Sequence, residues 1–191
     1  MMNTLRDEMK SYICVDVETA GPVPSRYALL SIGACTLGQP RESFYVELQP
    51  DKDLTDPEAM AVHNLDMVKL HQEGLPTEVS LLQFRDWISS VTPAGQKPVF
   101  VAFNAPFDWM FVHDYFMRYL GENPFGHSAI DIKAVYMGFS GKPWVETSGK
   151  ILHNIYNESK ALTHNALEDA IDQALIFQGI LADIEKRKPV S

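Results

Sequence analysis

The sequence predicts one α/β domain: a mixed sheet, made of an antiparallel three-stranded meander plus parallel strands, with helices on both faces. Three strand-like segments joined by short turns open the chain. Apolar helical stripes then alternate with two short strands, the order expected when helices cover a sheet. A length of 191 residues and an apolar fraction of 46% suit one globular domain. We therefore expect a single domain over 1–191, with its core at about 12–186.

The first part of the chain is rich in strand-forming residues. Runs of β-branched and aromatic residues predict strands at 12–19, 28–35 and 43–48, separated by turn residues that include Gly38-Gln39-Pro40. Asp56 is a good helix N-cap and is followed by a proline at the first helical position. A short helix from Pro57 to about His63 is expected there.

Helices dominate the second part of the chain. The segment 131–165 is broken by glycine and proline and predicts only short helices. Elsewhere apolar residues recur with helical spacing or form short buried runs. We expect helices at 78–90, at 106–119 and from 166 to about 186, and strands at 98–102 and near 129–130.

Composition excludes several classes of function. A net charge of −9 argues against broad duplex binding, which needs a basic surface, but allows a local acidic site for divalent cations. There is no apolar run of about 18 residues, so no membrane span is expected. Cys14 and Cys35 fall in apolar strands and predict buried free thiols in a reducing compartment, the cytoplasm.

Two carboxylates occupy one face of the first strand. Side chains alternate along a strand, so Asp16 and Glu18 point the same way, while Ile13, Val15 and Val17 point into apolar packing. Like charges on a central strand persist when they are partly protonated, paired with a cation or bound to a metal. The alternative is a strand end in solvent, where the acids are merely polar.

A third carboxylate follows the strand at 98–102. Pro106 suits the start of a helix, which puts Asp108 in the first helical turn, just beyond the carboxyl end of a buried strand. Ligand sites gather at that edge in open α/β sheets. The alternative is that Asp108 only complements the helix dipole.

The last polar cluster surrounds the start of the final helix. If that helix begins near Asn165, His164 hangs from the preceding loop while Asp169 projects from the first turn, and both can reach one site. If the whole cluster were helical, the two would not converge. The alternative is a solvent-exposed histidine and a surface aspartate.

Together these clusters resemble the motifs of a known superfamily. Asp16 with Glu18, Asn104-x-x-x-Asp108 and His164-x-Ala166-x-x-Asp169 are similar to the three motifs of the histidine-bearing (DEDDh, DnaQ-like) 3′-5′ exonucleases. That branch includes proofreading subunits of polymerases, ribonuclease T and oligoribonuclease. The resemblance covers about 12–181 and implies a ribonuclease H-like fold.

The resemblance implies a hydrolase that releases nucleoside 5′-monophosphates from 3′ ends of DNA or RNA. Two Mg²⁺ or Mn²⁺ ions would be held by carboxylates, as hard cations prefer. Asp16 would bridge the ions, Glu18 and Asp169 would help to hold the ion that carries the attacking water, and Asp108 would support the second ion. His164 would be the general base, because an imidazole accepts a proton near neutral pH.

Residues beside the motifs are candidate substrate contacts: Thr19, His63, Phe103, Asn104 and Phe107. His63 resembles a position near the terminal nucleotide, although Asn64 follows it where relatives carry glycine. Phe103 replaces a histidine of many relatives. Phe103 and Phe107 could stack bases, with core packing as the alternative. Asp131 rivals the motif acids, but we interpret it as the N-cap of the next helix.

The expected partner is a single-stranded 3′ end, and a homodimer is compatible with the family. Because little follows the last helix, we expect a free-standing enzyme rather than a polymerase proofreading subunit. Other hypotheses are an inactive protein that binds nucleic-acid ends and a structural Ca²⁺ module. The sequence leaves the choice between DNA and RNA open.

Overall fold

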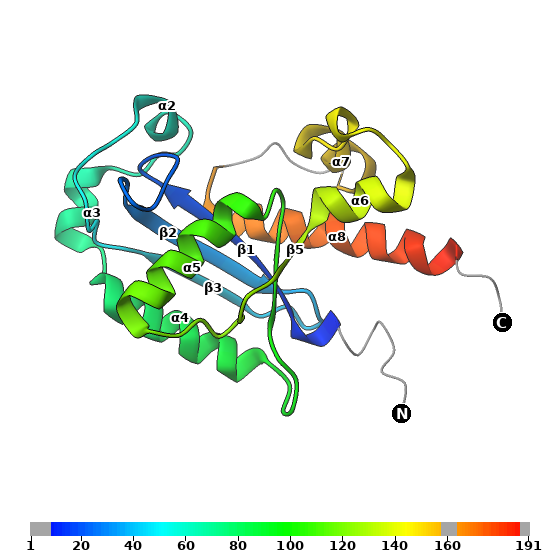
Figure 1. Ribbon diagram of the computed structural model, residues 1–191, viewed down its shortest axis with the longest axis horizontal. Helices are drawn as coiled ribbons and strands as arrows, with labels where there is room; N and C mark the ends of the chain where they lie inside the picture. The colour runs from blue at the N-terminus through cyan, green and yellow to red at the C-terminus, as the bar shows by residue number, and fades with distance from the viewer. Residues whose placement is uncertain (1–8, 158–163, 188–191) are drawn as a thin grey trace.

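The computed structural model describes residues 9–157 and 164–187. A five-stranded sheet runs through the molecule in the order β3-β2-β1-β4-β5 (Figure 1). The strands are β1 (Tyr12–Thr19), β2 (Leu29–Thr36), β3 (Ser43–Glu47), β4 (Val99–Ala102) and β5 (Ala129–Asp131). The first three form an antiparallel meander, β4 pairs with β1 in parallel, and β5 pairs with β4 in parallel. The predicted mixed sheet is confirmed.

Helices lie between and after the strands. A 3-10 turn, η1 (Met9–Ser11), precedes β1. The other helical elements are α2 (Pro57–Met60), α3 (Met67–Glu73), α4 (Thr77–Val91), α5 (Pro106–Leu120), α6 (Ile132–Ser140), η2 (Trp144–Glu146), α7 (Gly149–Tyr156) and α8 (Ala166–Arg187). None of the helices in the described part of the chain is long and apolar enough to cross a membrane.

The two faces of the sheet carry separate cores. On one face α4 and α5 pack on Ile13, Val15 and Val17, as the alternation of β1 predicts. On the other face α8 packs on the side of β1 and β2 that carries Cys14 and Cys35 (Figure 1). Both cysteines are buried and free. Asp16 and Glu18 therefore face the α8 side of the sheet.

Several expected boundaries were wrong. The first helix after the meander ends at Met60 rather than near His63, and α3 was not expected at all. In α3 only Leu70 is buried, so the sequence offers no apolar stripe, and the one local signal is the Asp66 cap, whose side chain accepts hydrogen bonds from two backbone N–H groups. The short helices expected within 131–165 are present as α6, η2 and α7, while 158–163 lie outside the described residues.

Candidate active site

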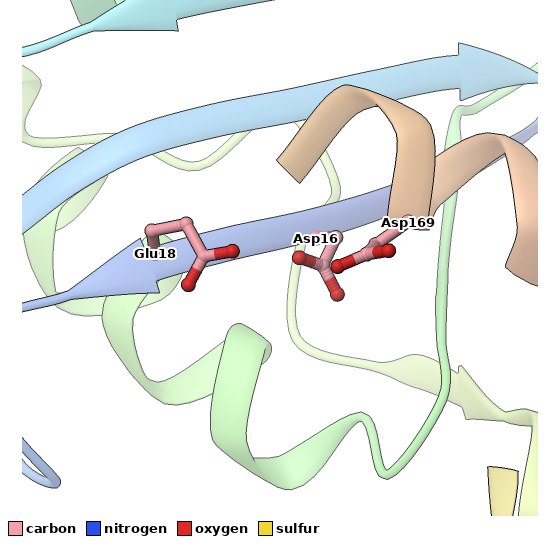
Figure 2. Close-up of side chains that lie close together, drawn as sticks. All are labelled: Asp16, Glu18 and Asp169. Atoms are coloured by element: carbon pink, nitrogen blue, oxygen red, sulfur yellow. The ribbon is translucent and has the colours of Figure 1, made fainter. Parts of the chain in front are cut away.

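Three carboxylates from two distant segments meet beside the centre of the sheet. Asp16 and Glu18 extend from β1, and Asp169 comes from the first turn of α8 (Figure 2). One oxygen of each lies within 4.8 Å of the others. An all-oxygen group of this kind suits a hard divalent cation. The expected convergence of these three acids is confirmed, and the strand-end alternative for Asp16 and Glu18 is wrong.

A glycine in β2 allows α8 to come this close. Asp16 lies opposite Gly33 in the antiparallel register of β1 and β2. A Cβ atom on Gly33 would overlap the backbone of Ala166 and Leu167. The first turn of α8 thus rests directly on the β2 backbone, and this contact brings Asp169 to Asp16.

The start of α8 separates His164 from Asp169. The side-chain oxygen of Asn165 accepts hydrogen bonds from the N–H groups of Leu167 (3.1 Å) and Glu168 (3.3 Å), so Asn165 caps the helix. His164 precedes the cap in the left-handed region, at φ 53°. It is exposed and lines a pocket of about 240 Å³ that Glu18 also lines. The helix start near Asn165 is therefore confirmed.

Asp108 approaches the same strand from the other side. It lies in the first turn of α5 and is 4% exposed. Because β4 pairs with β1 only as far as Cys14, the N–H of Val17 is free to donate to Asp108 Oδ1 (3.1 Å). Asp108 is not one of the three carboxylates that share a 4.8 Å group. Asp108 is nevertheless buried against β1. A residue that only complements the helix dipole could do so from the surface, so this burial points to a further role.

Burial and mutual repulsion raise the pKa values of these acids. Burial, and then the charges of Asp108, Glu18 and Asp169, raise the pKa of Asp16 well above its usual range. Burial and the charge of Asp169 raise the pKa of Glu18 to about 7. Burial raises the pKa of Asp108 to about 8, against the effect of the Val17 N–H. A bound cation would act in the opposite direction and stabilise the ionised carboxylates.

Gln173 is a site residue that the sequence analysis missed. Its Nε2 donates to Asp16 Oδ1 (2.6 Å), and its Oε1 accepts from the N–H of Phe103 (2.8 Å). The buried amide therefore fixes the orientation of Asp16 and the backbone at the end of β4. Gln173 follows Asp169 by four residues and so shares its helix face, which was the available signal.

His63 and Thr19 have their polar groups engaged inside the protein. His63 is buried, with Nε2 donating to the carbonyl of Thr19 (3.2 Å) and Nδ1 accepting from the N–H of Leu65 (3.3 Å). Burial lowers the pKa of His63, which favours this neutral form. The Thr19 hydroxyl donates to the carbonyl of Gly21 (2.9 Å). These bonds hold the loop after β1, and substrate contact by the two residues stays a prediction.

The turn between β4 and α5 carries the remaining candidates. Asn104 is exposed with φ 62°, and its carbonyl accepts from the N–H of Phe107 (3.1 Å). Phe107 is half-buried and packs against Phe111 at 5.5 Å between ring centroids. Asp131 accepts from the N–H groups of Ala134 and Ala105, both at 2.7 Å. Its interpretation as a helix cap is confirmed, and it also holds this turn.

Comparison with known proteins identifies the family. The model of the Rv2179c-like 3′-5′ exoribonuclease domain matches residues 11–181. The chain belongs to this family. The Rv2179c-like domain described here is 41% identical over 184 residues to the 3′-5′ DNA exonuclease Cap18 of Escherichia coli, over 96% of this chain and 98% of that protein. It is 27% identical to ribonuclease T of Histophilus somni (strain 129Pt), over 96% of this chain and 90% of that protein.

Solved structures show the same fold. The nuclease domain of 3′hExo, a DEDDh family member bound to rAMP, superposes with a TM-score of 0.73 at 15% identity, over 90% of this chain and 92% of that one. Exonuclease X in complex with 5′ overhanging duplex DNA gives 0.63 at 20% identity, with the same coverage. The expected ribonuclease H-like fold is confirmed, as is the resemblance to DEDDh-type enzymes. The Rv2179c-like domain is a 3′-5′ exonuclease.

Proposed function

We propose that the protein removes nucleoside 5′-monophosphates stepwise from 3′ ends of DNA or RNA, with Asp16, Glu18, Asp108 and Asp169 as metal ligands and His164 as general base. The observation that carries the proposal is the convergence of three carboxylates from β1 and α8 within 4.8 Å. Asp108 adds a fourth acid, buried against the backbone of the same strand.

The donor set fits divalent metal ions. Asp16, Glu18 and Asp169 offer only oxygen ligands, which hard divalent cations prefer. Burial and mutual repulsion raise the pKa values of Asp16 and Glu18, and a bound cation would stabilise their ionised forms. Two Mg²⁺ or Mn²⁺ ions held there would supply electrostatic stabilisation of the attacking and leaving oxygens. Gln173 would keep Asp16 in the orientation required for binding, through its bond to Oδ1.

His164 would accept the proton of the attacking water. Its ring is exposed and lines a pocket with Glu18, so it borders the carboxylate group without being buried in it. An imidazole in such a position can accept a proton from a water that lies beside the carboxylates. The Asn165 cap supports this role because it fixes the point at which the chain turns from His164 into α8.

The proposed substrate is a single-stranded 3′ end. Thr19 and His63, at the loop after β1, and Asn104 and Phe107, at the start of α5, would flank the terminal nucleotide, with Phe107 stacking on a base. Phe103 borders a pocket that Asp16 and Asp169 also line.

The same proposal covers the whole chain. We take 1–191 as one exonuclease domain, supported by the family match over residues 11–181. The two buried free thiols, Cys14 and Cys35, suit work in a reducing compartment such as the cytoplasm.

The test is a time course on 5′-labelled single-stranded DNA and RNA of equal sequence, with Mg²⁺, with Mn²⁺ and with EDTA. The wild-type protein should give a metal-dependent ladder that shortens from the 3′ end. Asp16→Asn should give none, whereas Asp86→Asn, at an exposed aspartate on α4, should behave as wild type. Intact oligonucleotides in every lane would instead favour a protein that only binds nucleic-acid ends.

A further inference from the structure

A second pocket borders the carboxylates and α7. It has a volume of about 190 Å³ and is lined by Asp16, Asp169 and Phe103, together with Gly149 at the start of α7. The ring of Phe103 lies against Gly149, where a Cβ atom would be 3.6 Å from the ring. Phe103 and the start of α7 therefore form adjoining parts of the pocket wall.

A lysine links Phe103 to an exposed tryptophan. Lys133 lies in the first turn of α6, and its Nζ is 6.0 Å from the centroid of the Phe103 ring and 4.0 Å from that of Trp144. Trp144, in η2, is 48% exposed. Within residues 9–157 and 164–187, Lys133 has no carboxylate partner, so its charge is neutralised by no neighbouring acid.

Both pockets that border the site are lined by acids. The pocket shared by Glu18 and His164 is also lined by Glu47, which pairs with Ser31 of β2 as Glu18 does. The pocket beside Phe103 is lined by Asp16, Asp169 and Asp172. Phosphates of a bound strand would be repelled by these acids, whereas beside the ring of Phe103 they would meet the Lys133 ammonium.

We propose that Phe103, Lys133 and Trp144 form a strand-binding platform for the nucleotides that precede the reactive 3′ end. A base stacks on the exposed indole of Trp144, and Lys133 binds the adjoining phosphate from its place between the two rings. Aromatic faces and a nearby cation are the elements by which proteins hold single strands without reading sequence. The platform rests on the proposed exonuclease function, and it accounts for how an acidic protein retains a polyanion.

The alternative explanation is that Lys133 and Trp144 only stabilise the loop after α6. In that case substitution lowers the stability of the protein and changes the rate of hydrolysis equally for every substrate. The platform predicts a dependence on substrate length, because a substrate with nothing beyond the scissile phosphate never reaches Trp144. The two explanations therefore differ in kinetics.

The test compares a twenty-nucleotide single strand with a small substrate, the p-nitrophenyl ester of thymidine 5′-monophosphate. Trp144→Ala should raise KM for the strand about tenfold, within the range for loss of one base–aromatic stack, with kcat little affected. Trp144→Phe should restore most of the loss. Val145→Ala, at the adjacent exposed side chain, is the matched control and should match wild type on both substrates.

Lys133→Gln gives an independent readout. Loss of one phosphate contact should reduce the slope of log KM for the strand against log salt concentration by about 0.7, as for single strands generally. Lys69→Gln removes the same charge from an exposed lysine of α3 and should leave the slope as in wild type. If the slope is the same in Lys133→Gln and wild type, the platform is wrong.

Failure of the platform is distinguishable from failure of the exonuclease proposal. A wild-type protein that hydrolyses neither substrate contradicts the proposed function, and with it the platform. Hydrolysis of both, with equal effects of Trp144→Ala on each, contradicts the platform alone. If Trp144→Ala does not fold, the test is instead how far the oligonucleotide quenches the tryptophan fluorescence of Asp16→Asn. Weaker quenching in the Asp16→Asn/Trp144→Phe double variant than in Asp16→Asn supports stacking on Trp144, and equal quenching in the two proteins excludes it.

Discussion

Asp16 and Gly33 face each other across β1 and β2, and the absent side chain of Gly33 is what admits the first turn of α8. The acid on one strand and the glycine on its neighbour are thus parts of a single arrangement. Asp16 supplies a carboxylate, and Gly33 supplies the space that lets Asp169 reach it. Without that close approach, the acids of β1 and α8 would not share one group.

Gly33→Ala should therefore disable the site while leaving the sheet intact. The new methyl group overlaps the backbone of Ala166 and Leu167, so α8 must move away from β2. We expect at least a tenfold loss of kcat and a destabilisation of about 1–3 kcal/mol, the usual cost of overpacking. Gly138→Ala in α6, where no atom lies within 4 Å of the added methyl, is the control and should be neutral or slightly stabilising. Full activity of Gly33→Ala would show that α8 tolerates displacement.

Gln173 should act mainly by holding the carboxylate of Asp16 in position, rather than by stabilising the fold. Gln173→Leu removes the bonds to Asp16 and to the Phe103 N–H, which leaves a buried donor unsatisfied at a cost of about 1–3 kcal/mol. We expect kcat to fall more than stability alone explains, with a weaker affinity for Mn²⁺. Gln178→Leu, five residues further along α8, also loses two bonds, one donated to the carbonyl of Leu37 (2.7 Å) and one accepted from Arg41 Nη2 (3.1 Å), but it is not part of the acid group. Equal kinetic effects of the two variants would contradict a role for Gln173 in the site.

The stability of the metal-free protein should fall as pH rises. The folded protein raises the pKa of Glu18 to about 7 and that of Asp108 to about 8, whereas unfolded carboxyls titrate near 4. Between those values the folded state binds more protons than the unfolded state, so the free energy of unfolding decreases from about pH 4 to about pH 8. Denaturant unfolding in EDTA at pH 5.5 and 8.5 measures this.

Added Mg²⁺ should weaken that pH dependence, because a cation replaces the protons. Glu18→Gln should also weaken it in EDTA, since one of the responsible groups is gone. Greater stability at pH 8.5 than at pH 5.5 in EDTA would contradict the burial of ionisable acids at this site.

His164→Ala should separate proton transfer from metal binding. We expect a rate lower by about 10²–10⁴-fold, the usual contribution of a general base, with the affinity for Mn²⁺ retained. Single-turnover rates and a Mn²⁺ titration measure the two properties. His71→Ala, at a half-exposed histidine paired with Asp53 (3.1 Å), is the control for loss of an imidazole elsewhere. If His164→Ala lost the metal instead, His164 would be a ligand rather than a base.

The strands and the face of the acids could be predicted because their signals are local. The alternation in β1 placed Asp16 and Glu18 on one face, which a single sequence displays. The meeting of Asp169 with these two acids was predicted from the resemblance of the three motifs to DEDDh-type enzymes, since the residues alone left a surface aspartate as the alternative.

The remaining features depend on tertiary contacts that no local pattern reveals. Gly33 resembles any strand glycine until α8 lies on it, and Gln173 resembles any polar helix residue until its amide meets Asp16 and the end of β4. Helix α3 escaped prediction because a single buried leucine gives no periodic signal. The bond between Val17 and Asp108 likewise requires β4 to stop pairing before that point in β1.

The central claim is that Asp16, Glu18, Asp108 and Asp169 together bind divalent ions. Anomalous diffraction from crystals of the protein grown with Mn²⁺ tests it most directly, with crystals of Asp16→Asn as the control. Two anomalous peaks among these carboxylates in the wild-type protein, reduced or absent in the variant, are the predicted result. Crystals with Mn²⁺ peaks elsewhere and none among the four acids would contradict the account.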